Sequence, residues 1–206
     1  MGALPAGGCT RRELLSGAIP SVGLGAATVS ILTAVGVETA SGQSETEAGS
    51  LTSVLEVELL VAFVYERVLG AQLLAVASAR VAAGLLAHER VHIALLRGWL
   101  STLGAPQTPA LVDDRAADRS LASHHVSVRL AGLRTERDAL RLLIAVEAVA
   151  VSAYGRLISA LINPMLVRSA AEMLASEAQH ATVLSGLLYP GDISRAVPDA
   201  FVTGRR

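Results

Sequence analysis

The side chains best suited to chemistry occur twice in the chain, in the same order and at nearly the same spacing. Each copy consists of a glutamate, a tyrosine seven residues later, and a Glu-x-x-His motif about 30 residues after the first glutamate. The first copy is Glu58, Tyr65, Glu89 and His92, and the second copy is Glu147, Tyr154, Glu177 and His180. This internal repeat predicts two helical hairpins that carry one polar pattern.

The spacing within each motif indicates which side chains can act together. Residues three positions apart share one face of a helix, so Glu89 and His92 can present a carboxylate and an imidazole side by side. The residues around these groups are mostly apolar, which places the motifs toward a hydrophobic core. Buried carboxylates repel one another and lose hydration unless cations compensate them. A glutamate from each of two helices, with Glu-x-x-His from two others, is a ligand set for two divalent metal ions.

Apolar residues recur with helical spacing from residue 51 to about residue 188. Ser53 and Glu56 have the spacing of a capping box, and Asn163 followed by Pro164 suits a helix start. The predicted helices span about 53–74, 79–103, 135–161 and 164–188, with a short helix across 119–132. The sequence therefore predicts an all-α, antiparallel four-helix bundle with a long crossover between its second and third helices.

The repeated motifs resemble those of the ferritin-like superfamily, and residues 51–188 are also similar to desiccation-related, ferritin-like proteins of bacteria. The resemblance implies two metal ions, with iron expected and manganese as the alternative. It also implies that two tyrosines hydrogen-bond ligand carboxylates, and that no catalytic residue exists apart from the metal site. In this scheme Glu58 and His92 bind one ion, Glu147 and His180 bind the other, Glu89 and Glu177 bridge both, and Tyr65 and Tyr154 are the tyrosines.

Simpler interpretations of these residues stay open at this point. The six acidic and histidine side chains could lie on helix surfaces, with Arg67, Arg90 and Arg156 as salt-bridge partners. The two tyrosines could contribute only to core packing.

The remaining histidines are less suited to metal binding. His88 lies four residues before His92, but Ser176 takes its place in the second copy, which favours a surface or supporting role over a ligand role. His124 and His125 lie in the predicted crossover, outside the repeat, and are expected to be exposed.

Composition excludes several other classes of protein. Hydrophobic residues make up 52% of the chain and charged residues 17%, which excludes a disordered protein. The net charge of -1 gives no basic surface for nucleic acid. Cys9 is the only cysteine, so disulfides within the chain and CxxC metal sites are excluded, including the thiolate iron centre of a rubrerythrin.

The N-terminal part differs from the rest. Arg11 and Arg12 precede a weakly apolar stretch, so residues 1–42 resemble a twin-arginine export signal, with an uncleaved membrane anchor as the alternative. Residues 43–50 are predicted to be a polar linker, and residues 189–206 an irregular tail. The protein is expected in the periplasm, the cell envelope or the medium, and would contact a membrane only through an uncleaved signal.

The expected function is an exported di-metal protein that oxidises ferrous iron with dioxygen or peroxide. The alternative is a non-catalytic metal-binding or structural protein that protects the cell envelope under stress. The sequence leaves the oxidant, the reductant and any organic substrate open, and it also leaves open whether two chains form a homodimer.

Replacing Arg11 and Arg12 by lysine tests the export signal. The precursor should stay in the cytoplasm, because the receptor of this pathway reads the arginine pair. Cell fractionation followed by immunoblotting measures the distribution. Unchanged delivery of the double variant to the envelope would show that the signal is of another type.

Overall fold

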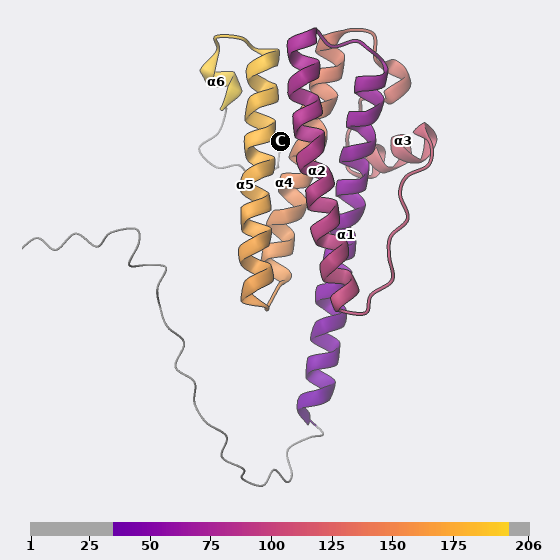
Figure 1. Ribbon diagram of the computed structural model, residues 1–206, viewed down its shortest axis with the longest axis vertical. Helices are drawn as coiled ribbons and strands as arrows, with labels where there is room; N and C mark the ends of the chain where they lie inside the picture. Colours follow the sequence, from indigo (N-terminus) through magenta and orange to yellow (C-terminus); the bar gives the residue numbers. More distant parts are fainter. Residues whose placement is uncertain (1–34, 198–206) are drawn as a thin grey trace, which may run out of the picture.

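The computed structural model describes residues 35–197, and for residues 35–45 it describes the backbone alone. The helices are α1 (Val35–Gly70), α2 (Val76–Thr102), α3 (Asp114–Ser123), α4 (Glu136–Ala160), α5 (Pro164–Leu188) and α6 (Ile193–Ala196), with a 3-10 turn at Leu130–Gly132. In Figure 1, α1, α2, α4 and α5 run side by side as a bundle, and the segment between α2 and α4 returns along its length. The predicted all-α bundle is confirmed.

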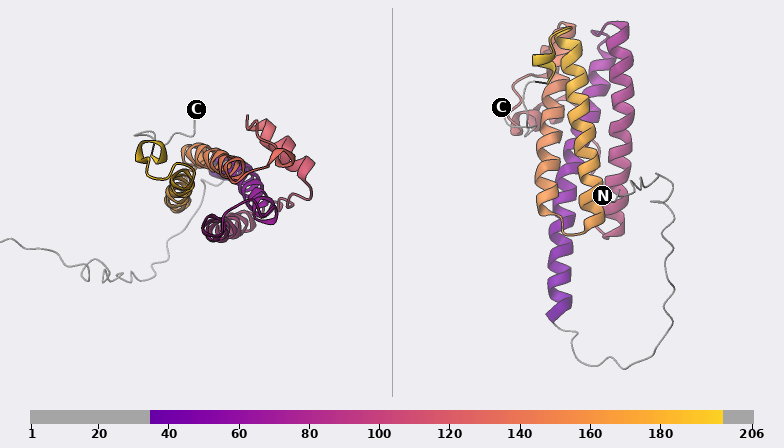
Figure 2. Two further views of the ribbon diagram at one scale, coloured as in Figure 1. Left: turned by 90° about the horizontal axis from the view of Figure 1, so that it is seen from above. Right: turned by 90° about the vertical axis from the view of Figure 1, so that its left-hand side faces the viewer.

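Helices α1 and α4 pack against each other, while α2 lies beside α1 and α5 lies beside α4 (Figure 2). Both α1 and α4 contain stretches long and apolar enough to cross a membrane, at Thr46–Gly70 and Glu136–Ala160, and about half or more of each stretch is buried within the bundle. α2 and α5 approach each other least closely among the neighbouring pairs.

Capping residues determine where the two helices of the second hairpin, α4 and α5, begin. The Thr135 side chain accepts a hydrogen bond from the N–H of Asp138, and the Asp138 carboxylate accepts one from the N–H of Thr135, which completes a capping box at the start of α4. Asn163 accepts from the N–H of Met165, and Pro164 occupies the first turn of α5. Both predicted helix starts are therefore correct to within one residue.

The crossover contains a helix, but at a different position from the predicted 119–132. Asp113 accepts a hydrogen bond from the N–H of Ala116 at 2.7 Å, so the helix begins at Asp114 and ends at Ser123. Its buried residues, Ala117 and Leu121, join the hydrophobic core. The crossover thus packs along the bundle while it returns the chain to the other end.

The segment 43–50, predicted to be a polar linker, is helical. α1 begins at Val35 and continues without interruption to Gly70, so the predicted helix start at Ser53 is also wrong. The physical reason is a tertiary contact. Oε1 of Glu47 accepts hydrogen bonds from the N–H groups of Ile162 and Asn163 at 2.7 and 2.9 Å, which fixes α1 against the turn between α4 and α5.

The two ends of the chain are described only in part. The predicted signal at residues 1–42, including Arg11 and Arg12, lies outside the described residues up to position 34. In the predicted irregular tail, Ile193–Ala196 form the single turn of α6, capped by the Asp192 side chain, and residues 198–206 lie outside the described part.

Glu47→Ala should destabilise the fold by about 1–2 kcal/mol, because two N–H groups at a helix turn lose their acceptor. Urea denaturation of the metal-free protein measures the change. Glu56→Ala is the matched control, since Glu56 is an exposed glutamate on the same helix. Equal stability of the two variants would mean that the Glu47 contact does not anchor α1.

Candidate metal centre

The structure brings the six predicted ligands together in the interior of the bundle. Glu58 lies on α1, Glu89 and His92 on α2, Glu147 on α4, and Glu177 and His180 on α5. All four glutamates have an exposed fraction of 0%, and the two histidines have 7% and 3%. Because each Glu-x-x-His pair spans one helical turn, both of its side chains point to the same interior point.

The ligand atoms form two overlapping groups. In each group a carboxylate oxygen or imidazole nitrogen from every member lies within 4.8 Å of the others. The first group is Glu58, Glu89, His92 and Glu177, and the second is Glu89, Glu147, Glu177 and His180. The two glutamates shared by the groups are those in the Glu-x-x-His motifs.

Eight buried polar atoms in this cluster form no hydrogen bond with the protein. They are Oε2 of Glu58 and Glu147, both carboxylate oxygens of Glu89 and Glu177, and Nδ1 of His92 and His180. Nδ1 of His92 lies 2.7 Å from Oε1 of Glu177, and Nδ1 of His180 lies 2.8 Å from Oε1 of Glu89. These contacts are short enough for charge pairing, but they lack the direction of a hydrogen bond.

The two tyrosines hold the remaining oxygens. The Tyr154 hydroxyl on α4 donates to Oε1 of Glu58 at 2.5 Å, and the Tyr65 hydroxyl on α1 donates to Oε1 of Glu147. Each tyrosine therefore supports the glutamate of the other hairpin, and Oε2 of that glutamate stays free to face the cluster. Both tyrosines are fully buried. They pack in the core and also bind a carboxylate.

The histidines are protonated when no metal is bound. Burial lowers the pKa of His92, but the carboxylates around it, led by Glu177, outweigh burial and raise the pKa to about 12. Burial lowers the pKa of His180 as well, and the surrounding carboxylates, led by Glu147, raise it to about 11. Both imidazoles therefore carry a positive charge at neutral pH.

The glutamates divide into two pairs. Burial raises the pKa of Glu58 and of Glu147 well above the ordinary value, which favours the protonated form of both carboxyls. Burial acts in the same direction on Glu177, but the two histidines outweigh it and lower its pKa to about 2. They lower the pKa of Glu89 in the same way. With Glu58 and Glu147 protonated, two carboxylates would face two imidazolium ions, and the metal-free cluster would carry no net charge.

A family model described as a ferritin-like domain matches residues 46–190, more than two thirds of the chain. The chain belongs to the ferritin-like family. The match begins within the segment predicted to be a linker, next to Glu47. Comparison with curated proteins and with solved structures finds no match.

The ferritin-like domain does not use surface arginines to pair its central carboxylates. Arg67 pairs with Asp114 at 2.6 Å, and Arg90 pairs with Glu66 at 2.9 Å, in both cases between exposed side chains. Arg156 donates to the Ser152 hydroxyl. The interpretation in which these arginines neutralise surface glutamates of the motifs is therefore wrong, because all four glutamates are buried elsewhere.

Sequence reasoning did not identify the contacts on the outer side of His180. Nε2 of His180 lies 3.1 Å from Nδ1 of His88 and 3.2 Å from Oγ of Ser176. The signal was present in the repeat, because these two residues occupy equivalent positions in the two hairpins. The repeat indicated a surface or supporting role for His88, but it did not indicate that His88 contacts the ring of His180.

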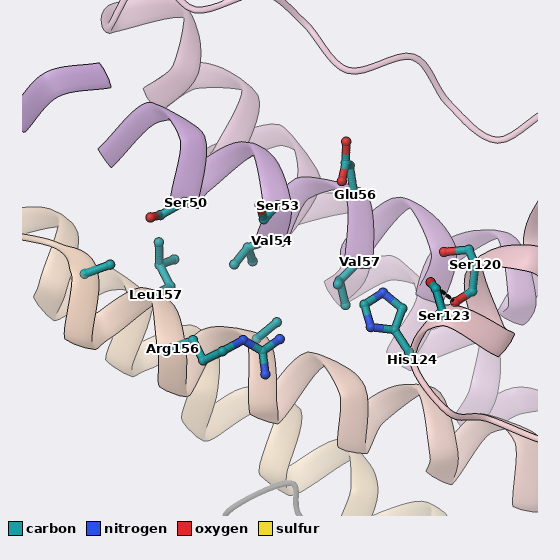
Figure 3. Close-up of a pocket in the computed structure, with 12 residues that line it drawn as sticks. Ser50, Ser53, Val54, Glu56, Val57, Ser120, Ser123, His124, Arg156 and Leu157 are labelled. Atoms are coloured by element: carbon teal, nitrogen blue, oxygen red, sulfur yellow. Dashed lines mark hydrogen bonds between the residues drawn. The ribbon is translucent and has the colours of Figure 1, made fainter. Parts of the chain in front are cut away.

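A groove of about 520 Å³ lies between α1, α3 and α4 of the ferritin-like domain, and none of the six cluster residues lines it. Figure 3 shows Glu56, His124 and Arg156 along it. Burial and the Arg156 charge lower the pKa of His124 below its ordinary value. His124 is half-buried, whereas the sequence predicted an exposed side chain.

We expect the metal-free domain to lose stability as the pH rises above about 6.5, the ordinary pKa of histidine. A histidine whose pKa is higher in the folded chain than in the unfolded chain stabilises the fold. This stabilisation is complete at pH values below the pKa in the unfolded chain, and it is lost as the pH rises to the pKa in the folded chain. For His180 this window extends to about pH 11. Melting curves recorded from about pH 6 to pH 10 should show a falling Tm.

The variant with His92→Gln and His180→Gln should lack the part of this fall that the two imidazoles contribute, while Glu58 and Glu147, whose pKa values are also raised, still contribute theirs. A wild-type Tm that stays constant from pH 6 to 10 would contradict the protonated state of the cluster.

Proposed function

We propose that this ferritin-like domain binds two divalent metal ions in its central cluster. The observation that carries the proposal concerns the described side chains, residues 46–197, in which the eight buried side-chain atoms without hydrogen bonds all belong to the six cluster residues. Native proteins leave very few buried polar atoms without a hydrogen bond, so eight in one place support a ligand-binding site. Carboxylate oxygens and imidazole nitrogens are donors that suit iron and manganese.

The free atoms divide naturally between two ions. Glu58 and His92 each offer one free atom to the first ion, and Glu147 and His180 do the same for the second. The remaining four atoms belong to Glu89 and Glu177, both of whose carboxylate oxygens lack a hydrogen bond and which are members of both groups. These two glutamates would therefore help to hold both ions in our proposal.

We further propose that the domain oxidises ferrous iron with dioxygen or peroxide. A bound metal pair supplies the redox chemistry and a binding position for the oxidant. The chain's own part is to hold the carboxylates in place through Tyr65 and Tyr154, and to exclude bulk water with the apolar core. The alternative is a metal-binding protein of the desiccation-related, stress-protection type, without turnover.

Export is part of the same proposal. The arginine pair before an apolar stretch supports delivery of the folded, metal-loaded protein by the twin-arginine pathway. The described bundle contacts begin at about Glu47, so a mature chain cut near residue 42 would keep them.

Metal loading of variants tests the binding proposal. Glu177→Ala should lower occupancy at both positions, since Glu177 belongs to both groups, whereas His92→Ala should mainly weaken one. Wild-type protein should be stabilised by ferrous or manganous ion, by about 2.7 kcal/mol at a hundredfold excess over Kd. Metal analysis and melting curves under anaerobic conditions measure both effects.

Fewer than one ion per wild-type chain, with no shift in Tm, would contradict the metal centre. If two ions bind, oxygen consumption upon addition of ferrous iron decides between the two functions. Wild type and the surface variant Glu66→Ala should consume oxygen at the same rate, and Glu147→Ala should be much slower. Tight binding without oxygen or peroxide consumption would favour the stress-protection alternative.

A further inference from the structure

The two histidines of the cluster differ in what surrounds their outer nitrogens. Nε2 of His180 has two polar neighbours, Nδ1 of His88 at 3.1 Å and Oγ of Ser176 at 3.2 Å. The rings of His88 and His180 are also stacked, with centroids 5.2 Å apart and an angle of 28° between their planes. Nε2 of His92 forms no hydrogen bond within the described part of the chain.

The repeat explains this difference. His88 precedes Glu89 by one residue, and Ser176 precedes Glu177 by one residue, so the two positions are equivalent. The longer imidazole reaches from α2 across to the ligand on α5. The short serine side chain contacts His180, one turn along its own helix, and makes no such contact with His92 on α2. One substitution between the copies thus gives Nε2 of His180 two polar neighbours, whereas Nε2 of His92 has no hydrogen bond within the described residues.

We propose that His88 is a positioning residue that makes the two metal positions unequal, with tighter binding at the position that contains His180. The proposal rests on the two-metal function above. His180 faces the cluster with Nδ1, so when this nitrogen binds a metal ion the ring proton stays on Nε2, which can donate it to Nδ1 of His88. Such an outer hydrogen bond fixes the ring and makes the ligating nitrogen more basic.

His88 is exposed, so its replacement removes no buried side chain. Loss of the outer partner of a ligating histidine lowers metal affinity by about 10–100-fold. That loss should fall on one position only, because His92 has no corresponding contact with His88.

The experiment measures the affinity of each position separately. His92→Ala leaves the position with His180 intact, and His180→Ala leaves the position with His92 intact. Manganous ion is titrated into both variants by calorimetry under anaerobic conditions, with and without the additional change His88→Ala. We expect His92→Ala to bind its tighter ion more strongly than His180→Ala does. Adding His88→Ala should weaken binding about 10–100-fold in the first background and leave it unchanged in the second.

Rescue and control variants separate positioning from folding. Asparagine can place an acceptor oxygen near the position of Nδ1, so His88→Asn should restore most of the affinity that His88→Ala loses. His124→Ala, a histidine change in the separate groove, should leave both affinities unchanged. The Tm of metal-free His88→Ala should match that of wild type.

An equal loss of affinity in both backgrounds would overturn the proposal in favour of a general structural role. No loss in either background would overturn it as well. Failure of the wild type to bind ions is a different result, because it would remove the metal centre itself.

Discussion

Four carboxyl groups enclosed by apolar side chains must be compensated in charge, and this constraint governs the rest of the structure. Full ionisation would place four negative charges within a few ångströms of one another, out of contact with water. Without metal, the cluster avoids this by keeping protons on Glu58 and Glu147 and by pairing the other two glutamates with protonated histidines. Two divalent ions would provide the same balance with all four carboxylates ionised and both imidazoles neutral.

Tertiary contacts keep this arrangement fixed. The crosswise hydrogen bonds of Tyr65 and Tyr154 join α1 to α4 at the level of the cluster. Glu47 fixes α1 to the α4–α5 turn at one end of the bundle. At the other end, the N–H of Ala75 donates to the carboxylate of Glu136, which ties the α1–α2 turn to the start of α4. The two hairpins are thus held together at three levels, in addition to the contacts that the ligand residues themselves make between α2 and α5.

The sequence was sufficient for the features that repeat or that depend on neighbouring residues. The duplicated motifs predicted which six side chains would meet, and the capping residues Thr135 and Asn163 predicted the starts of α4 and α5. The sequence was insufficient where a contact with a distant part of the chain determines the local structure. Residues 43–50 are polar enough for a linker, and they are helical because Glu47 binds a turn more than a hundred residues away. The side to which His88 turns likewise depends on the packing of α2 against α5.

The exchange of protons for metal ions is the central claim, and titration calorimetry in buffers of different ionisation enthalpy tests it most directly. Two protonated carboxyls and two imidazolium ions should give up about four protons when two ferrous or manganous ions bind at neutral pH. We therefore expect about two ions bound and about four protons released per chain. Ions that bind without releasing protons, or fewer than one ion per chain, would contradict the account.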